Sequence, residues 1–99
     1  MKEKYFEFVA RLTKERDEFL DKLRSDGNIE AVILKVYEIN YKNEIISFLE
    51  NNDDYLIDEL SDIKFEKINL EYLYNSWIYW SGDSLSDCVE EAIKTKGGK

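Results

Sequence analysis

The chain has no histidine, no proline and only one cysteine, Cys88. Histidine is the commonest general base and metal ligand in proteins, so its absence argues against an enzyme and against a bound metal. A single cysteine excludes an internal disulfide, and no histidine is present to activate Cys88 as a nucleophile. The absence of proline permits long helices. We therefore expect a helical, non-enzymatic protein that needs no cofactor.

Long hydrophobic runs are also missing. No stretch approaches the roughly 18 apolar residues that a membrane span requires, and charges interrupt the first apolar residues, unlike those of a signal peptide. Hydrophobic residues make up 43% of the 99 residues, which is enough for one globular core but leaves no room for a second domain. The sequence thus predicts a single cytoplasmic helical domain over residues 1–96 and a disordered tail over 97–99.

The spacing of apolar residues predicts an all-α bundle of four to five helices. Between Lys2 and Ser25 apolar residues recur every three or four positions, which is typical of an amphipathic helix. Asp26 and Gly27 then provide a stop signal.

A second helix is predicted from Asn28, which can cap it, to about Asn51. Its apolar residues occupy most of its circumference, and a helix that is apolar on more than one face is usually surrounded by other helices. We therefore expect the helix from Asn28 to Glu50 to be the central one of the bundle. The β-branched stretch that begins at Ala31 favours a strand by propensity, so a strand is the alternative there.

Asp53 and Asp54 mark the start of a short third helix, because carboxylates stabilise a helix N-terminus. A connector over residues 61–67 follows, with Ile63 and Phe65 as its apolar anchors.

The last two predicted helices each follow a capping residue. Asn69 opens the fourth helix, which we expect to end at Gly82. Asp83 or Ser84 then caps a final helix whose apolar residues fit one helical face, Cys88 among them.

Charge is distributed unevenly along the chain. Residues 1–26 carry seven basic and seven acidic side chains and sum to zero, whereas residues 43–93 carry two basic and thirteen acidic ones, which gives 2 − 13 = −11. The whole chain carries −8. A field of this sign repels nucleic acid and attracts basic protein surfaces. We expect a basic protein partner and no direct binding to nucleic acid.

The acidic side chains concentrate between residues 50 and 66. Adjacent carboxylates on a helix point about 100° apart, so they do not share a proton as a catalytic pair does. Asp54, Asp58 and Asp62 recur every four residues, a spacing of like charges that destabilises a helix and often marks a binding surface. The stretch lacks the glycine and the terminal glutamate of a calcium loop. Mimicry of a nucleic-acid strand and generic solubility are both open explanations. The candidate partner-binding residues here are Glu50, Asp53, Asp54, Asp58, Glu59, Asp62 and Glu66.

Five aromatic residues occur between Tyr72 and Trp80 on one predicted helix. Trp77 and one neighbour fit its core-facing side, whereas Tyr72 and Tyr79 lie opposite. A domain of this size can hardly bury all five, and tyrosine and tryptophan are common at protein interfaces. Tyr72, Tyr79 and Trp80 are therefore further candidates for partner binding, with partial exposure as the alternative. The acidic surroundings argue against stacking on nucleic-acid bases.

Three parts of the sequence carry a resemblance to a known family: Val36–Glu50, the group of Leu73, Tyr74 and Trp77, and Asp87–Ile93. Together they resemble a domain-of-unknown-function family of small acidic proteins from bacterial phages and mobile elements, over roughly residues 30–93. The resemblance implies no site residue. It implies a context, because such proteins are often inhibitors of host nucleic-acid-binding machinery, anti-CRISPR proteins included.

These observations predict a non-enzymatic acidic inhibitor, encoded by a phage or mobile element, that blocks the basic nucleic-acid-binding groove of a host protein such as a CRISPR effector. The carboxylates would steer the encounter and the exposed aromatic rings would add affinity. The alternative is a homo-oligomeric structural or regulatory adaptor. In that reading the aromatic helix forms a homodimer interface and the charge serves only solubility.

Overall fold

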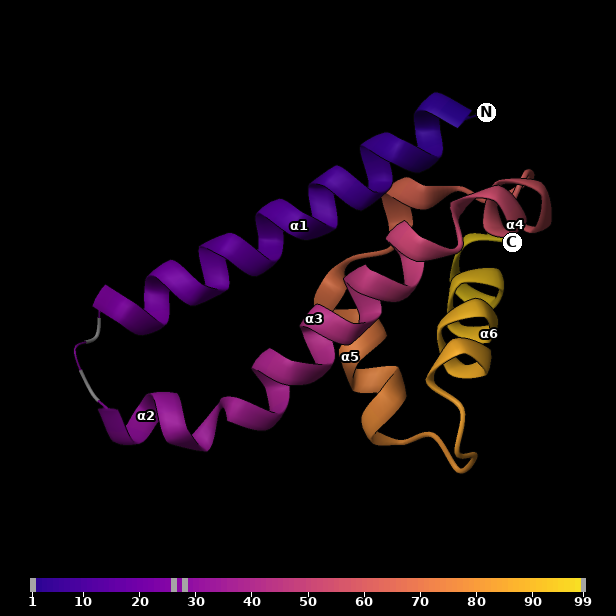
Figure 1. Cartoon of the computed structure of the whole chain (residues 1–99). Helices are drawn as coiled ribbons and strands as arrows, with labels where there is room; N and C mark the ends of the chain where they lie inside the picture. The colour runs from indigo at the N-terminus through magenta and orange to yellow at the C-terminus, as the bar shows by residue number, and fades with distance from the viewer. Residues whose placement is uncertain (1, 26, 28, 99) are drawn as a thin grey trace.

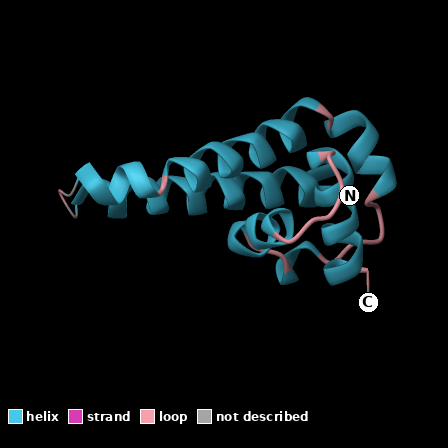
Figure 2. Cartoon of the chain, turned by 90° about the horizontal axis from the view of Figure 1, so that it is seen from below, coloured by secondary structure: helices cyan, strands magenta, loops and turns pink. Residues whose placement is uncertain are grey.

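The computed structural model describes residues 2–25, 27 and 29–98 (Figure 1). Every regular element within these residues is helical (Figure 2), which confirms the all-α prediction. The predicted second helix is divided in two, so six α-helices and one 3₁₀ helix are described. They are α1 (Lys2–Ser25), α2 (Ile29–Leu34), α3 (Val36–Asn51), α4 (Asp53–Glu59), the 3₁₀ helix η1 (Phe65–Lys67), α5 (Leu70–Ile78) and α6 (Leu85–Gly97).

Helix α1 has the predicted bounds and supplies one side of the core. Its buried residues, Tyr5, Phe8, Val9, Leu12 and Leu23, follow the three- and four-residue spacing of the sequence. The Tyr5 hydroxyl donates a hydrogen bond to the carbonyl oxygen of Leu49 near the C-terminal end of α3. Burial, together with the negative charge of Asp53, raises the pKa of Tyr5, so this donor stays protonated.

The predicted second helix is interrupted at Lys35. The backbone nitrogen of Lys35 donates to the carbonyl oxygen of Val32 at 3.1 Å, a three-residue turn rather than a four-residue one. The ψ angle of Lys35 is 4°, which departs from α-helical geometry. Helix α2 therefore ends at Leu34 and α3 begins at Val36. The β-branched residues form a short helix, not the alternative strand, and the predicted cap Asn28 lies outside the described residues.

Helix α3 is central only over its C-terminal part. It contacts α1, α2, α4, α5 and α6, and it buries Ile45, Ile46 and Leu49 completely. Helix α2 and the first turn of α3 instead run beyond α5 and α6, side by side with the end of α1, as an arm (Figures 1 and 2). The expectation that other helices surround the whole segment from Asn28 to Glu50 is therefore wrong for its first third.

A buried charge cluster joins α3 to its neighbours. Lys42 is only 4% exposed, and its Nζ donates to Glu38 at 2.6 Å and to Glu71 of α5 at 3.0 Å. The same ammonium lies 3.9 Å from the centre of the Phe19 ring of α1, a cation–π distance. Lys42 thus ties together α1, α3 and α5 through one charge.

Glu38 makes part of the stability of the fold dependent on pH. Burial opposes its ionisation, but the hydrogen bond from Lys42 and the charges of Lys42 and Lys35 outweigh it, so the pKa of Glu38 lies below its ordinary value of 4.5. Because the folded-state pKa is the lower one, ionised Glu38 stabilises the fold above about pH 4.5, and this contribution is lost as the pH falls through the folded-state pKa.

Urea unfolding at a series of pH values measures this dependence. We expect the free energy of unfolding to decrease from about pH 5 downward, and to decrease less steeply in Glu38→Gln, which cannot ionise at this position. Equal slopes in the two proteins would show that Glu38 contributes nothing to the acid sensitivity.

The connector after α4 packs on α1 through Phe65, one of its two predicted apolar anchors. Phe65 is buried and its ring stacks on Phe8 with 4.6 Å between ring centres. Arg11 donates to the carbonyl oxygens of Phe65 at 2.7 Å and Ile68 at 2.6 Å. Glu15 pairs with Arg11 at 3.0 Å and accepts a hydrogen bond from the Leu70 backbone at 2.9 Å. The Arg11–Glu15 ion pair on α1 thus provides hydrogen-bond partners for two backbone carbonyl oxygens, those of Phe65 and Ile68, and for the backbone N–H at the start of α5.

Helices α5 and α6 begin at the predicted caps. The Asn69 side chain accepts from the backbone of Tyr72, and the Ser84 side chain accepts from that of Asp87. Helix α5 ends at Ile78, four residues before the expected end at Gly82. Helix α6 continues to Gly97, which is buried, whereas the sequence predicts a disordered tail from that residue on. A Cβ atom on Gly97 would lie 2.5 Å from Cγ2 of Ile63, so only glycine allows this close approach.

Candidate protein-binding surface

The predicted acidic residues gather around α4. Leu56 and Leu60 are buried, which turns the remaining sides of this short helix outward. Asp53 and Asp54 occupy its first turn, where the helix dipole favours negative charge. The Asp53 carboxylate also accepts a hydrogen bond from the Asp54 backbone at 2.9 Å. We call acidic surface the set of Glu50 at the end of α3, Asp53, Asp54, Asp58 and Glu59 on α4, and Asp62 and Glu66 on the connector.

The row of carboxylates at four-residue spacing is shorter than predicted. Helix α4 ends at Glu59, and Asp62 lies in the turn that follows it. Only Asp54 and Asp58 therefore keep the helical i to i+4 relation, and only one like-charge pair opposes this helix. The reason lies in length, because a helix of seven residues holds two such positions and not three.

Little positive charge neutralises the acidic surface. Glu59 pairs with Lys94 of α6 at 3.2 Å, and this hydrogen bond raises the pKa of Lys94. Among the residues that the structure describes, the other six members of the acidic surface form no ion pair. All of them except the half-buried Asp53 are exposed. Their charge is therefore directed at solvent or at a partner.

A groove separates the acidic surface from α1. Its volume is about 420 Å³. The floor is mostly apolar and two carboxylates stand on its α3 and α4 side; the lining residues are Tyr5, Phe6, Val9, Ala10, Thr13, Glu50 and Asp53. Phe6 is 46% exposed at its edge. An apolar floor beside carboxylates fits the side chain of lysine or arginine, whose stem is apolar and whose tip is cationic.

The aromatic candidates do not form one patch. The Tyr72 hydroxyl donates to the carbonyl oxygen of Ala92 at 3.0 Å, and its ring packs against the core. Tyr72 thus joins α5 to α6, which covers the side of α5 that the sequence left unpartnered. Trp80 is half-buried, and a Cβ on Gly82 would lie 2.7 Å from its indole nitrogen. Tyr79 alone projects freely, with 86% of its surface exposed.

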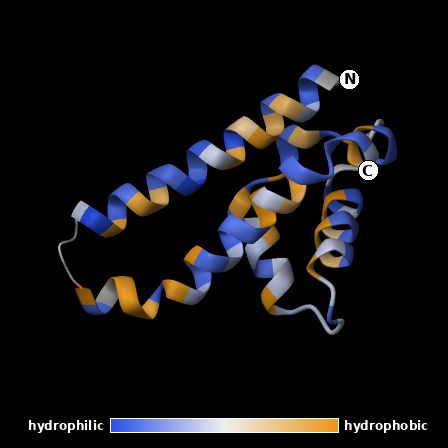
Figure 3. Ribbon diagram, in the orientation of Figure 1, coloured by the Kyte–Doolittle hydropathy of each residue, from blue (hydrophilic) through white to orange (hydrophobic). Residues whose placement is uncertain are grey.

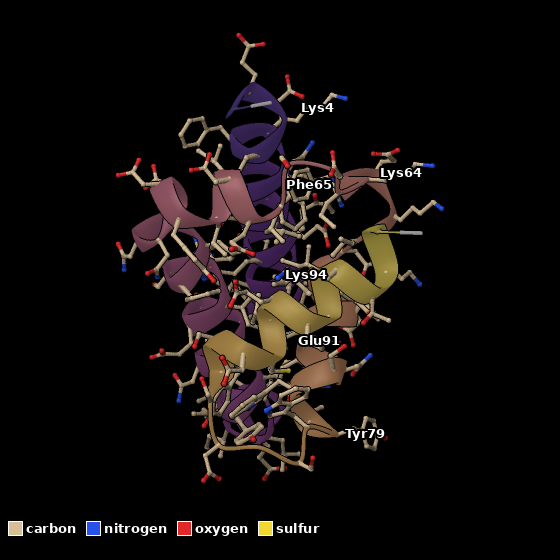
Figure 4. All side chains as sticks on the ribbon, turned by 90° about the vertical axis from the view of Figure 1, so that its right-hand side faces the viewer. Lys4, Lys64, Phe65, Tyr79, Glu91 and Lys94 are labelled. Carbon is tan, nitrogen blue, oxygen red and sulfur yellow. The ribbon has the colours of Figure 1, made fainter. Side chains whose placement is uncertain are left out.

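Tyr79 and the acidic surface lie at opposite ends of the molecule. Helix α5 runs away from α4, so its C-terminal end is remote from it (Figure 1). Figure 4 likewise places Tyr79 at the end opposite Lys64 and Phe65 of the connector. The structure therefore places five of the acidic candidates at the end of α3 and on α4 and the other two, Asp62 and Glu66, on the connector that follows, and it separates α4 and the connector from Tyr79.

Comparison of the chain with protein-family models, with curated proteins and with solved structures found no match. Cys88 is 1% exposed, and burial raises the pKa of its thiol, which disfavours the reactive thiolate. Its predicted place in the core is confirmed.

The described residues were compared with the requirements of a metal site and of a membrane-spanning helix. Within residues 2–25, 27 and 29–98, no group of three or more cysteine or acidic side chains is placed to hold a metal ion. None of the described helices has both the length and the hydropathy for crossing a bilayer.

One exposed apolar surface was not predicted from the sequence. Ile29, Ile33 and Leu34 of α2 are 76%, 63% and 82% exposed, and Val36 and Tyr37 of α3 are 45% and 53% exposed. We call these five residues the arm surface. The sequence did contain a sign of this surface, because the predicted central helix is apolar on a second face. We interpreted that second face as one that other helices of the same chain cover.

Proposed function

We propose that this protein is a non-enzymatic inhibitor that binds a basic surface of a nucleic-acid-binding protein through its acidic surface. The observation that carries the proposal is the set of six carboxylates around α4 that have no ion-pair partner among the described residues. A surface that only aids solubility gains nothing from concentrating like charges, because they repel one another. A basic partner converts that repulsion into attraction.

Inhibition follows from competition for the same positive groove. Lysine and arginine side chains that bind phosphates also bind carboxylates, with the best geometry for arginine. The charge of −11 over residues 43–93 steers a positively charged protein toward this surface and repels nucleic acid. The resemblance to small acidic phage proteins supports a cytoplasmic inhibitor from a phage or mobile element, with a CRISPR effector as one such target.

Affinity in this proposal comes from apolar contacts beside the acidic surface, not from the aromatic end of α5. Phe6 borders the groove, and Tyr55 on α4 is 53% exposed. A lysine or arginine of the partner would lay its stem on the apolar floor and direct its charge toward Glu50 and Asp53. Partly buried contacts of this kind add more binding energy than rim charges do.

Pull-down from a bacterial lysate, with and without nuclease, tests the proposal. We expect the wild-type protein to capture a basic nucleic-acid-binding protein whether or not nuclease is present. Asp54→Lys combined with Asp58→Lys reverses the charge at two of the seven acidic positions and reduces the charge of the acidic surface from −7 to −3, so association should slow by about 10-fold or more.

The matched control carries the same change in net charge elsewhere. Glu18 on α1 and Glu44 on α3 are exposed and lie outside the acidic surface, so Glu18→Lys combined with Glu44→Lys should retain most of the binding. Equal loss in both double variants would mean that only net charge matters and that the acidic surface is not a specific site.

A further inference from the structure

The arm surface gathers five exposed apolar residues at one end of the molecule. Tyr37 has ring contacts within the chain, with Tyr41 at 4.6 Å and edge-on with Tyr74 at 6.3 Å between ring centres, and its remaining surface is exposed. Figure 3 shows hydrophobic residues covering α2 and the start of α3, away from α5 and α6. Ile29, Ile33 and Tyr37 are spaced by four residues and follow one side of the arm, with Leu34 and Val36 beside them. Val32 and Ile39 are half-buried instead. The arm therefore has one apolar side against the fold and a second one in solvent.

The size of the arm surface is close to that of a protein interface. At the observed exposed fractions its five side chains offer on the order of 600 Å² per copy. Typical monomers have a largest apolar patch of roughly 300 to 600 Å², and each partner in a standard interface buries roughly 800 Å². The arm surface thus reaches the upper limit for a monomer and provides most of the area of a modest dimer.

Charge decides which partner fits. Residues 1–42 carry nine basic and nine acidic side chains and sum to zero, so the arm offers nothing to attract a strongly charged protein. Two copies of a chain that carries −8 repel each other. They can associate only through a neutral surface that keeps their acidic surfaces apart, and the arm projects on the side away from α4 (Figure 1).

We propose that the arm surface is a homodimer interface, in which α2 of each copy packs antiparallel against the other about a twofold axis near Ile33. Such an interface is isologous, so each apolar residue meets the same apolar surface in the second copy. The segment that the sequence predicts to be surrounded on both faces becomes surrounded in the dimer.

Sedimentation velocity of the full chain, from about 1 to about 200 µM, measures the association. We expect the wild-type protein to pass from monomer to dimer across this range. Ile33→Ser combined with Leu34→Ser removes the centre of the arm surface without changing net charge, and should weaken dimerisation by about 100-fold, since each residue occurs twice in the interface. Both residues are largely exposed, so circular dichroism and the urea midpoint should match those of the wild type at about 1 µM, where both proteins are monomeric.

Ile78→Ser combined with Tyr79→Ser is the matched control. It removes exposed apolar surface from the end of α5, where Ile78 is 45% and Tyr79 is 86% exposed, again without a change in charge. This variant should dimerise like the wild type. A wild-type protein that stays monomeric throughout overturns the proposal. The proposal is also overturned if the α5 variant no longer dimerises while the arm variant dimerises like the wild type.

Salt separates this proposal from the binding of a basic partner. Added salt screens the repulsion between two acidic copies, so dimerisation should strengthen as salt rises, whereas binding through the acidic surface should weaken. A dimer that dissociates at higher salt would contradict an apolar interface on the neutral arm. Dimerisation and binding of a basic partner use different residues, so an experiment can disprove one without disproving the other.

Discussion

Lys42→Ala is expected to lower the free energy of unfolding by about 3 kcal/mol. The substitution removes a charge that is 4% exposed and leaves the carboxylate of Glu38 in a mostly buried site without its closest partner. It also removes the cation from the face of the Phe19 ring and the link to Glu71. Urea unfolding at pH 7, followed by circular dichroism, measures the change. A fold of this size has little stability to spare, so the variant should be partly unfolded near body temperature.

Two further variants show that the loss comes from the unpaired charge. Lys35 also contacts Glu38, at 3.4 Å, but its side chain is half-exposed, so Lys35→Ala should cost less than about 1 kcal/mol. Combining Glu38→Gln with Lys42→Met removes both charges and should cost clearly less than the sum of the two single changes. Additive losses would mean that Glu38 and Lys42 do not stabilise each other along α3.

Phe65→Ala is expected to cost about 3 to 4 kcal/mol in the free energy of unfolding. Phe65 stacks on Phe8 and meets the Tyr5 ring edge-on at 6.0 Å between centres. Its ring anchors the connector, of which η1 is a part, on α1. Two hydrogen bonds from Arg11, to the carbonyl oxygens of Phe65 and Ile68, support the same attachment. Its loss leaves a cavity beside α1 and loosens the segment that carries Asp62 and Glu66.

Phe6→Ala is the control for Phe65→Ala. Phe6 is the same residue type and lies on α1, the helix against which Phe65 packs, but it is 46% exposed, so its removal should cost about 1 kcal/mol or less. Hydrogen exchange of the connector amides gives a second readout, because Phe65→Ala should increase exchange there before it increases exchange in α3. Similar losses in both variants would show that the connector is not anchored through Phe65.

Elements with local signals could be predicted from the sequence. Helix α1 has a complete apolar spacing and a stop at Gly27, whose φ of 62° suits glycine best. Asn69 and Ser84 cap α5 and α6 through their own side chains, so the start of each helix depends only on nearby residues. The clustering of acidic residues around α4 was likewise visible because neighbours in sequence stay neighbours in a short helix.

Features that depend on distant contacts could not be predicted. The interruption at Lys35 has no glycine or proline to mark it, and the second apolar face of α2 gives no sign of whether the chain or another molecule covers it. Tyr72 stands opposite the core on α5 alone, but α6 returns to that side and accepts its hydroxyl hydrogen bond at Ala92. The distance between Tyr79 and α4 follows from the direction of α5, which the sequence does not encode locally.

The acidic surface and the arm surface divide the molecule by charge. The arm belongs to the half that sums to zero and is apolar, and α4 belongs to the half that carries −11 over residues 43–93. A dimer joined through its arms would present two acidic surfaces to a target. Two linked surfaces bind a repeated or large basic groove more tightly than one, provided that both can engage at once.

The dependence of association rate on salt tests the central claim most directly. The protein captured in the pull-down is immobilised, and the association rate of the wild type and of the Asp54→Lys, Asp58→Lys variant is measured from about 50 to about 500 mM salt. Binding through the acidic surface predicts a wild-type rate that falls at least about 10-fold over this range, and a variant rate that is slower at low salt and falls clearly less over the same range. A wild-type rate that does not change with salt, or a variant with the same salt dependence as the wild type, would contradict the account.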